Sequence, residues 1–431
     1  MARNSDADSL IAFLNASPTP FHAVEAAAIR LRSLGAVALD EKETWSLKPG
    51  QTAYVTRNQS SIVAIRIPAD LGPGTSGSIA FRIVAAHTDS PCLKLKPRAP
   101  ESMANYRQWG VEVYGGILHN SWLDRDLGVA GRITRMGDDG IHSQLVRTED
   151  KPFRIPQLAI HLDRGVNESG LILNAQRHLV PILGLSDPPG RSFESWLEEA
   201  AGASLESLSC ELHLYDTTPA GYGGFDDEFV FSGRLDNLAM SHAALEAFAR
   251  EPAAPNVIQV TALFDNEEVG STSAQGANSN LIEAVLERVL LALGRTREEA
   301  MAAQARSLLI SADMAHAIHP NYPEKHEPCH YPLLNRGPVV KGNVNMRYAT
   351  NGETSARFKD WCRRAGVPVQ DFVNRTDLAC GTTIGPHVAA ALGIPTVDVG
   401  NPMLSMHSAR EMCGADDHGL MIRVMREFFR G

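Results

Sequence analysis

The sequence predicts an α/β domain that is formed by both ends of the chain and interrupted by a mainly β insert. From residue 236 onward, apolar strand-like runs alternate with amphipathic helical segments, which is typical of a sheet with crossover helices. Between residues 93 and 231, short β-like runs are broken by Gly and Pro instead. The first segment is too short to be a complete α/β domain. We therefore assign residues 1–92 and 232–431 to one discontinuous domain and residues 93–231 to the insert.

The N-terminal segment is expected to contain helices and then strands. Pro20 opens the amphipathic stretch FHAVEAAAIRLRSLG, which stops at Gly35 and predicts a helix. TAYVT and SIVAIRI, separated by four polar residues, predict a β-hairpin. The apolar run FRIVAA (81–86) predicts a buried strand that ends at His87.

The insert and the last segment differ in the length and order of their elements. In the insert we expect strands at VEVYGG, GVAGRITRM, IHSQLV and CELHLYD, and a helix at SFESWLEEAAG. In the last segment the expected helices are DNLAMSHAALEAFAR, NLIEAVLERVLLALG, ETSARFKDWCRRAG, GTTIGPHVAAALG and HGLMIRVMREFF. The strands expected between them are NVIQVTALF, SLLISA and IPTVDV.

Composition excludes several classes of protein. The formal net charge of -10 and a pI near 5.8 argue against a nucleic-acid groove, which needs a basic surface. The six cysteines form no C-x-x-C pair, which fits a reducing compartment. The N-terminal stretch MARNSDADSL lacks an apolar signal region, and the most apolar helical window carries Glu283, Glu287 and Arg288. We therefore expect a cytoplasmic protein without a membrane span.

Metal-binding residue types recur just after apolar strand-like runs. Because the carboxyl ends of strands in an open α/β sheet face one crevice, these side chains are expected to converge. The set contains no thiolate and is rich in carboxylates, which suits two divalent ions: zinc, cobalt or manganese. Carboxylates also bridge paired ions in two-metal hydrolases. The residues are His87, Asp236, Glu267, Glu268, Asp313 and His407.

The neighbours of these residues suggest separate roles. Asp89 lies two residues after His87, so its carboxylate can accept the other ring N–H and fix the tautomer. Glu267 and Glu268 are adjacent, and successive side chains of an extended backbone point to opposite faces. One of them can bind metal while the other acts as a general base.

Each piece also has a simpler interpretation. A single H-T-D is usually a loop, Asp236 alone could cap the following helix, and the Glu pair could be a solvated turn. Among 50 acidic residues and 15 histidines, Asp313 and His407 alone would not stand out. Only the combined pattern favours a metal site.

The motifs together resemble the aspartyl aminopeptidase family of di-zinc metallopeptidases, over nearly the whole chain. They are AAHTDSPCLKLKP, YGGILHNSWLDRDLGVAGR, FSGRLDN, LFDNEEVGS, SADMAHAIHPNYPEKHE and MHSAREM. The resemblance implies a mixed-sheet catalytic domain interrupted by a β-rich dimerisation domain. It also implies assembly of dimers into a larger, tetrahedral complex, with a dodecamer as the candidate size. One ion is expected on His87, Asp236 and Asp313 and the other on Asp236, Glu268 and His407, with Glu267 as the base.

The resemblance extends to residues that contact the substrate. His316 is implied to donate a hydrogen bond to the scissile carbonyl oxygen, and Lys341 and Tyr348 to line the substrate pocket. His161 is implied to reach the pocket of a neighbouring subunit. Without the resemblance, His316 would be interpreted as a loop histidine and Lys341 as an exposed lysine. Tyr348 would be interpreted as a packed aromatic residue and His161 as a strand side chain. GTTIGPH (381–387) lacks the lysine of a P-loop, so we interpret it as a helix-opening turn.

The predicted function is therefore a metalloaminopeptidase that releases N-terminal residues, with Asp or Glu preferred because Lys341 recognises their carboxylate. Metal-activated water is expected to attack the peptide carbonyl, with Glu267 as the general base. Two alternatives remain at this point. One is a di-metal amidohydrolase that deacylates small N-acyl substrates, and the other is a non-catalytic assembly or cargo-binding protein of the same fold.

Overall fold

The structure, a computed structural model, describes residues 4–71, 79–98, 103–148, 152–188 and 190–431. The chain forms two compact units: unit 1 comprises Met1–Asp89, Ala220–Met406 and Glu411–Gly431, and unit 2 comprises Ser90–Pro219 and His407–Arg410. The expected domain boundary at 231/232 differs from these bounds. Residues 220–231, which were expected in the insert, belong to unit 1, where β13 (Phe229–Ser232) pairs with β21 (Glu411–Gly414).

Unit 1 is built on a nine-stranded mixed sheet. Strands β14, β4, β15 and β19 are consecutive parallel neighbours at its centre, so their carboxyl ends lie at one edge. The hairpin expected from TAYVT and SIVAIRI is the antiparallel pair β2 and β3. The order is β1 (Val37–Leu39), β2 (Thr52–Arg57), β3 (Ser61–Arg66), β14 (Val257–Phe264), β4 (Ala80–His87), β15 (Leu308–Ala312), β19 (Thr396–Gly400), β17 (Val339–Gly342) and β18 (Gln370–Val373).

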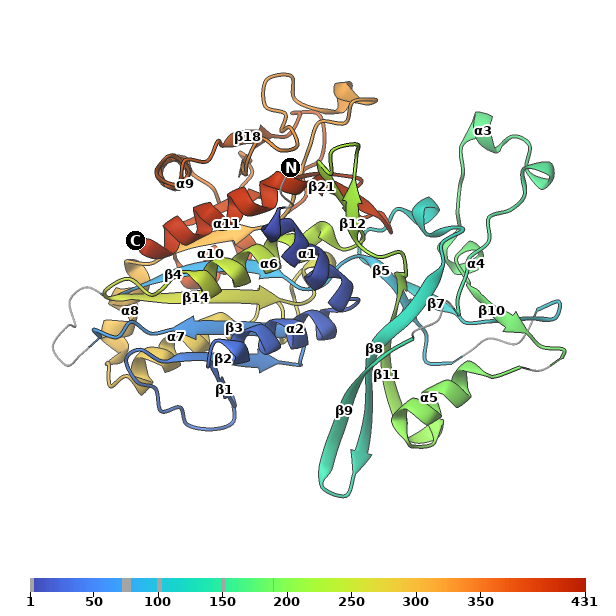
Figure 1. The fold of residues 1–431 in the computed structure, drawn as a ribbon, viewed down its shortest axis with the longest axis horizontal. Coiled ribbons are helices and arrows are strands. Elements are labelled where there is room, and N and C mark those ends of the chain that lie inside the picture. The colour runs from blue at the N-terminus through green and yellow to red at the C-terminus, as the bar shows by residue number, and fades with distance from the viewer. Residues whose placement is uncertain (1–3, 72–78, 99–102, 149–151, 189) are drawn as a thin grey trace. The chain divides into compact units, whose positions relative to one another are not determined.

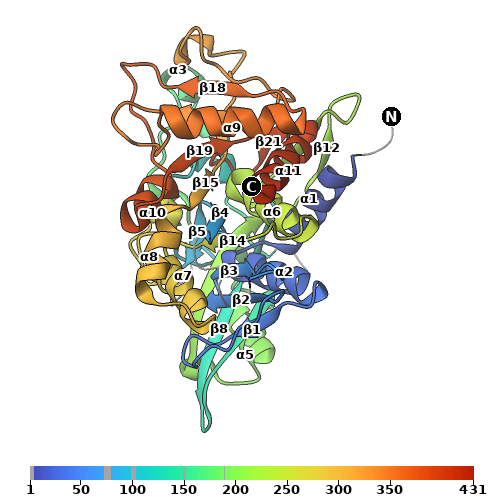
Figure 2. The same ribbon diagram turned by 90° about the vertical axis from the view of Figure 1, so that its left-hand side faces the viewer.

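Helices cover both faces of this sheet (Figures 1 and 2). One apolar core lies beneath α1 (Ser5–Ala16), α2 (Pro20–Ser33), α6 (Leu235–Arg250), α9 (Gly352–Ala365) and α11 (Ala415–Arg430). A second core lies on the other face beneath α7 (Leu281–Ala292), α8 (Arg297–Ala305) and α10 (Ile384–Leu392). The central strands are buried by both layers, which explains why FRIVAA and VTALF are continuously apolar.

Local signals account for where the helices begin and end. The Thr19 side chain accepts a hydrogen bond from His22 N, Pro20 occupies the first turn of α2, and Gly35 follows the helix at φ +78°. Helix α8, which the sequence pattern did not predict, begins with a capping box between Thr296 and Glu299.

Unit 1 has a second, five-stranded sheet, and unit 2 has its own. In unit 1 the order is β12 (Gly221–Gly223), β13, β21, β20 (Pro402–Leu404) and β16 (Ala315–His316). In unit 2 it is β7 (Val111–Tyr114), β5 (Cys92–Leu95), β11 (Leu208–Asp216), β8 (Leu127–Gly137) and β9 (Gly140–Arg147). Unit 2 also contains the pair β10 (Ile182–Leu185) and β6 (Tyr106–Gln108), and the helices α3 (Val166–Ser169), α4 (Ala175–His178) and α5 (Phe193–Ala201). The strands and the helix expected in the insert are therefore confirmed.

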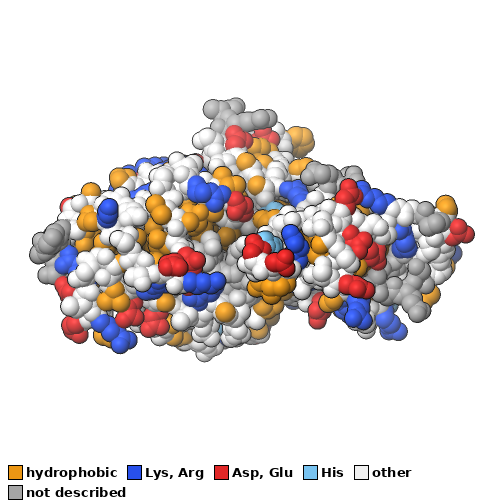
Figure 3. Space-filling view, turned by 90° about the horizontal axis from the view of Figure 1, so that it is seen from below, with side chains coloured by type: hydrophobic (Ala, Val, Ile, Leu, Met, Phe, Trp, Pro, Cys, Tyr) orange, Lys and Arg blue, Asp and Glu red, His pale blue; other side chains and the backbone are white. Residues whose placement is uncertain are grey.

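The surface is charged and of mixed sign. On the face drawn in Figure 3, acidic and basic side chains are interspersed and hydrophobic side chains lie between them. Among the described residues, no helix combines the length and the apolar character that crossing a bilayer requires.

Candidate active site

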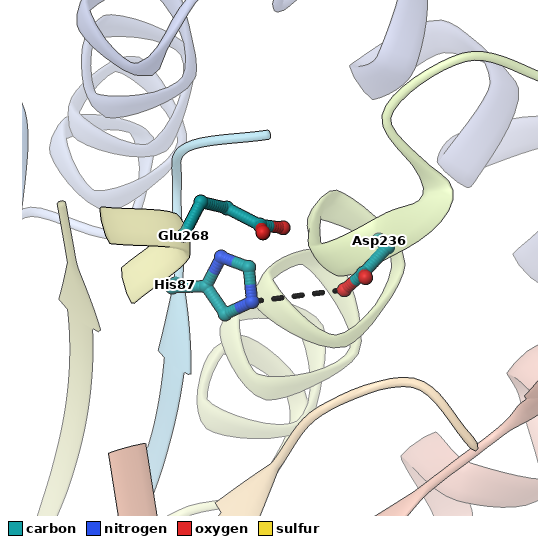
Figure 4. Close-up of side chains that lie close together, drawn as sticks. All are labelled: His87, Asp236 and Glu268. Atoms are coloured by element: carbon teal, nitrogen blue, oxygen red, sulfur yellow. Dashed lines mark ion pairs between the residues drawn. The ribbon is translucent and has the colours of Figure 1, made fainter. Parts of the chain in front are cut away.

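Three predicted ligands converge at the carboxyl edge of the central sheet. His87 ends β4, Asp236 lies in the first turn of α6, and Glu268 lies in the short helix η4 (Glu267–Val269) that follows β14. One ligand atom from each lies within 4.8 Å of the other two, and His87 Nε2 is 3.6 Å from Asp236 Oδ1. Figure 4 shows the imidazole and the Glu268 carboxylate both directed toward Asp236. This spacing is compatible with ligation of a shared cation.

Asp89 contacts three of the clustered residues. Its Oδ1 accepts a hydrogen bond from Glu267 N at 3.2 Å, and its Oδ2 accepts one from Glu268 N at 3.1 Å. Its Oδ1 also lies 3.4 Å from His87 Nδ1, which is 3.1 Å from the Asp89 carbonyl oxygen. One buried carboxylate thus contacts both glutamates through their backbone and the histidine through its ring.

Glu267 and Asp313 complete an acidic ring around His87. Glu267 Oε2 and Asp313 Oδ1 each lie 4.0 Å from His87 Nε2. Asp313 directly follows β15, the strand next to β4, which places it at the same edge. On its other side, Asp313 Oδ2 lies 3.8 Å from Lys341 Nζ.

Burial and the proximity of several carboxylates shift the pKa values of this cluster. Burial, together with neighbouring carboxylates, raises the pKa of Glu267 to about 8 and that of Asp313 to about 6. Burial also raises the pKa of Glu268 well above its ordinary value. Burial opposes protonation of His87, but the Asp89 hydrogen bond and the Glu267 charge outweigh it and raise the His87 pKa.

Positive charge held between Glu267, Glu268 and Asp313 would favour the ionised form of all three carboxyl groups at neutral pH. The residues therefore fit divalent cations with oxygen and nitrogen ligands, zinc among them. His87, Asp236, Glu268 and Asp313 are the side chains of unit 1 that would hold such ions.

Residues that the sequence analysis did not single out hold these ligands in place. Glu411 Oε2 accepts a hydrogen bond from Asp236 N at 3.2 Å. Asn237 Nδ2 donates to the Ala312 carbonyl at 2.8 Å, and Ser241 Oγ donates to the His87 carbonyl at 2.6 Å. Asn237 and Glu411 belong to the FSGRLDN and MHSAREM motifs, but no spacing rule links those two segments.

The predicted substrate residues of unit 1 lie in different environments. His316 is exposed on β16, with its ring centroid 6.1 Å from that of Phe372. Lys341, in contrast, is only 2% exposed on β17, and its Nζ donates to the Met314 carbonyl at 3.0 Å. Tyr348 is also buried, and Lys341 Nζ lies 5.2 Å from the centre of its ring. Lys341 is therefore part of the buried wall behind Asp313.

The GTTIGPH segment opens a helix at a buried carboxylate. Thr383 caps α10 by accepting from Gly385 N, and its hydroxyl donates to Asp398 Oδ1 at 2.6 Å. Asp398 Oδ2 accepts a hydrogen bond from Ala349 N at 2.5 Å. A Cβ on residue 385 would lie 2.3 Å from Asp398 Oδ2, which explains the glycine. The Asp398 carboxylate is thus the anion at the N-terminus of α10.

Two predicted site residues lie in unit 2. His407 belongs to the segment 407–410, and its Nδ1 lies 3.0 Å from the Gly116 carbonyl oxygen. His161 lies in the short helix η2 (Ile160–Leu162), within an exposed stretch of unit 2. Within the described residues, the group with the spacing of metal ligands is His87, Asp236 and Glu268, and the neighbouring histidines His319, His326 and His330 are not part of it.

Comparison with known proteins identifies the family. Residues 13–429 match the family described as Aminopeptidase I zinc metalloprotease (M18). The chain is 46% identical to a probable M18 family aminopeptidase 2 from Streptomyces coelicolor, covering 98% of this chain and 97% of that protein. It is 42% identical to an aspartyl aminopeptidase from Dictyostelium discoideum, covering 98% and 96%.

Solved structures show the same fold. A cryo-EM structure of the Ape4 and Nbr1 complex superposes with a TM-score of 0.93 at 41% identity, covering 99% of this chain and 85% of that chain. The S. cerevisiae mApe1 dodecamer superposes with a TM-score of 0.82 at 29% identity, covering 98% and 96%. Because the family match spans almost the whole chain and a buried cluster of His and carboxylate ligands lies at the expected edge of the sheet, this protein belongs to the M18 family of zinc aminopeptidases.

Proposed function

We propose that this M18 aminopeptidase holds two divalent ions and releases acidic N-terminal residues from peptides, with Glu267 as the general base. The observation that carries the proposal is the convergence of His87, Asp236 and Glu268 within 4.8 Å, with Glu267 and Asp313 beside them. When bound, the ions supply Lewis-acid activation of water and of the scissile carbonyl. We expect His407 to complete the ligand set.

The side chains of the protein carry the proton transfers. Glu267 lies beside the clustered ligands, with its Oε2 4.0 Å from His87 Nε2, and we assign to its carboxylate the role of taking a proton from the attacking water. As the C–N bond breaks, the same carboxyl group returns the proton to the leaving amine. The exposed imidazole of His316 donates a hydrogen bond to the carbonyl oxygen as negative charge develops there.

Substitution of each glutamate in turn tests this division of labour. Glu267→Gln is expected to retain zinc and to lose about 10²- to 10⁴-fold in kcat, because the general base acts on water. Glu268→Gln, the matched control at the adjacent position, is expected to lose bound zinc. Zinc content by atomic absorption and initial rates on a peptide substrate distinguish the two. Loss of zinc from Glu267→Gln with retention in Glu268→Gln would exchange the two roles.

The acidic preference rests on Lys341. A lysine ammonium has three donors, and the Lys341 ammonium directs one at the Met314 carbonyl and lies 3.8 Å from Asp313 Oδ2. A substrate carboxylate that binds beside Lys341 would find a buried positive charge, without which its desolvation is unfavourable. The relative from Dictyostelium discoideum is named an aspartyl aminopeptidase, which supports the same preference.

The test of this preference uses a ratio, because a ratio does not depend on how much enzyme is loaded with metal. We expect Lys341→Met to lower the kcat/KM of a Glu-peptide relative to the matching Leu-peptide by about 10- to 100-fold, as a charged hydrogen bond contributes about 1.5–3 kcal/mol. An unchanged ratio, or a wild-type preference for Leu, removes the acidic assignment and leaves the aminopeptidase intact. Failure to cleave free peptides while N-acetylated ones are cleaved would favour the deacylase alternative.

We further propose that unit 2 mediates self-association and that His161 serves the site of a neighbouring copy. Several apolar side chains of this unit are highly exposed, among them Met136, Leu162 and Ile172. The solved dodecamer of the S. cerevisiae relative is consistent with assembly. The cysteines, none of them in a disulfide, are consistent with a cytoplasmic location.

Complementation tests the role of His161. His161→Ala and Glu267→Gln chains are each expected to be inactive alone. When they are co-refolded or co-expressed, each mixed dimer should contain one complete site and therefore reach up to half of the activity of a wild-type dimer. A mixture that stays inactive, although sedimentation shows mixed oligomers, would place His161 outside the neighbouring site.

A further inference from the structure

Unit 1 contains a groove beside His316 that the proposed chemistry does not use. A hollow of about 310 Å³ opens between the His316 end of β16, the loop that follows it, and the residues after β18. A second hollow, of about 780 Å³, continues from it toward the loop after β17. The two hollows share six lining residues, so they form one groove: Glu327, Val373, Asn374, Arg375, Leu378 and Ala379.

The groove is basic although the chain has a net charge of -10. Its cationic lining residues are Lys325, Arg375 and Arg347, and its one acidic lining residue is Glu327. The Glu327 charge is already engaged, because Oε2 accepts from Cys329 N at 2.8 Å and lies 2.7 Å from His330 Nδ1. Arg375 is likewise paired, with Asp377 at 2.5 Å.

Arg347 differs from these residues. Its Nε donates to the Cys380 carbonyl at 3.4 Å, and no ion pair within the described residues includes it. The guanidinium therefore has donors available toward the groove, in a geometry suited to a carboxylate. Val344 and Leu378, both exposed, are apolar residues of the groove lining.

The orientation of the bound peptide determines which of its residues lie in this groove. In the proposed function, the N-terminal residue lies by Lys341 and Tyr348, which are buried and form a closed wall. The scissile carbonyl lies at His316, so the residues on the leaving side must continue into open space. The groove begins at His316, and an extended peptide advances about 3.3–3.6 Å per residue along it.

We propose that the groove binds the leaving side of the peptide and that Arg347 recognises a carboxylate there. This inference rests on the proposed function. The carboxylate comes either from an acidic side chain within a few residues of the cleaved bond or from the C-terminus of a short peptide. Preference for such substrates is thus set separately from preference for the first residue.

The experiment scans tetrapeptides that begin with Glu and are otherwise Ala, with one Asp moved through positions two to four, each as free acid and as C-terminal amide. We expect wild type to hydrolyse the best acidic peptide with a kcat/KM about 3- to 10-fold above that of the neutral amide, mainly through KM. Arg347→Gln is expected to bring this ratio close to one. Arg297→Gln, which alters an exposed arginine of α8 outside the groove, is expected to retain the wild-type ratio. Comparison of free acids with amides identifies the source of the carboxylate.

The failures can be told apart. Cleavage of Glu-p-nitroanilide, which has no leaving-side residues, reports on the proposed function alone. If it is cleaved and wild type shows no acidic preference, or Arg347→Gln keeps that preference, the inference is overturned. If a second copy of the chain covers the groove instead, Arg347→Gln alters the sedimentation coefficient without altering the ratio, which also overturns it. If no substrate is cleaved, calorimetry with zinc-loaded Glu267→Gln decides, since tighter binding of acidic than of neutral tetrapeptides is still expected.

Discussion

Asp89→Asn tests whether one buried carboxylate sets the geometry of the metal site. In the wild-type structure its two oxygens accept from Glu267 N and Glu268 N at 3.2 and 3.1 Å, and Oδ1 also lies 3.4 Å from His87 Nδ1. Asparagine keeps one accepting oxygen and presents an NH₂ group in place of the other. One of the two backbone N–H groups then faces a donor, and the negative charge behind His87 is lost.

The size of the effect follows from these contacts. A buried N–H left without its acceptor costs about 1–3 kcal/mol. Loss of a group that orients metal ligands typically lowers metal affinity or activity about 10- to 100-fold, which is about 1.4–2.7 kcal/mol. His87 Nδ1 also lies 3.1 Å from the Asp89 backbone carbonyl, which the substitution retains. We therefore expect Asp89→Asn to lower zinc affinity or activity by a factor in the lower half of the range of about 10- to 100-fold.

The assay is a zinc titration in competition with a chromophoric chelator, followed by initial rates on a Glu-peptide at saturating zinc. Asp360→Asn is the matched control, because Asp360 is a half-exposed surface residue of α9 that pairs with Arg363. Asp360→Asn is expected to leave both the zinc affinity and the initial rate unchanged. Zinc affinity and kcat of Asp89→Asn both equal to wild type would refute the organising role of this carboxylate.

Three further outcomes are expected. Gly385→Ala is expected to destabilise the fold by about 1–3 kcal/mol and to lower the melting temperature, because the added Cβ meets Asp398. Gly352→Ala is the control: its Cβ meets no atom within 4 Å, so the melting temperature is expected to stay nearly unchanged. Burial lowers the pKa of His242 to about 3 and that of its partner His418 well below the ordinary value. Between about pH 3 and 6.5 the unfolded chain thus binds more protons at His242 than the folded chain, so the unfolding free energy should decrease as the pH is lowered through this range, by up to about 1.4 kcal/mol per pH unit for this imidazole. A denaturant midpoint that does not change with pH would contradict this. Prolonged dialysis against a chelator is expected to abolish peptidase activity and added zinc to restore it; full turnover by protein shown to be metal-free would exclude a metal mechanism.

Local pattern predicted most elements of the fold. The buried strands β4 and β14 are continuously apolar, and α2 carries its capping and stop residues within the segment itself. Helix α8 was not predicted because it is weakly apolar, and its signal is the Thr296 capping box rather than a periodic stripe. The short strands β17 and β18 are four residues each, which is too short for periodicity to identify them.

The sequence alone determined which residue types follow the central strands, because the apolar run and the acid or histidine after it are contiguous in the chain. That was sufficient to predict that His87 and Glu268 would converge, since parallel strands end at one edge. Asp236 instead follows β13 of the second sheet and reaches the same place through the first turn of α6. Only the tertiary structure decided what surrounds them. The Asp89 carboxylate meets backbone groups 178 and 179 residues away, and Lys341 lies buried behind Asp313 rather than exposed. Such contacts depend on how distant segments pack, and no local periodicity or spacing encodes that packing.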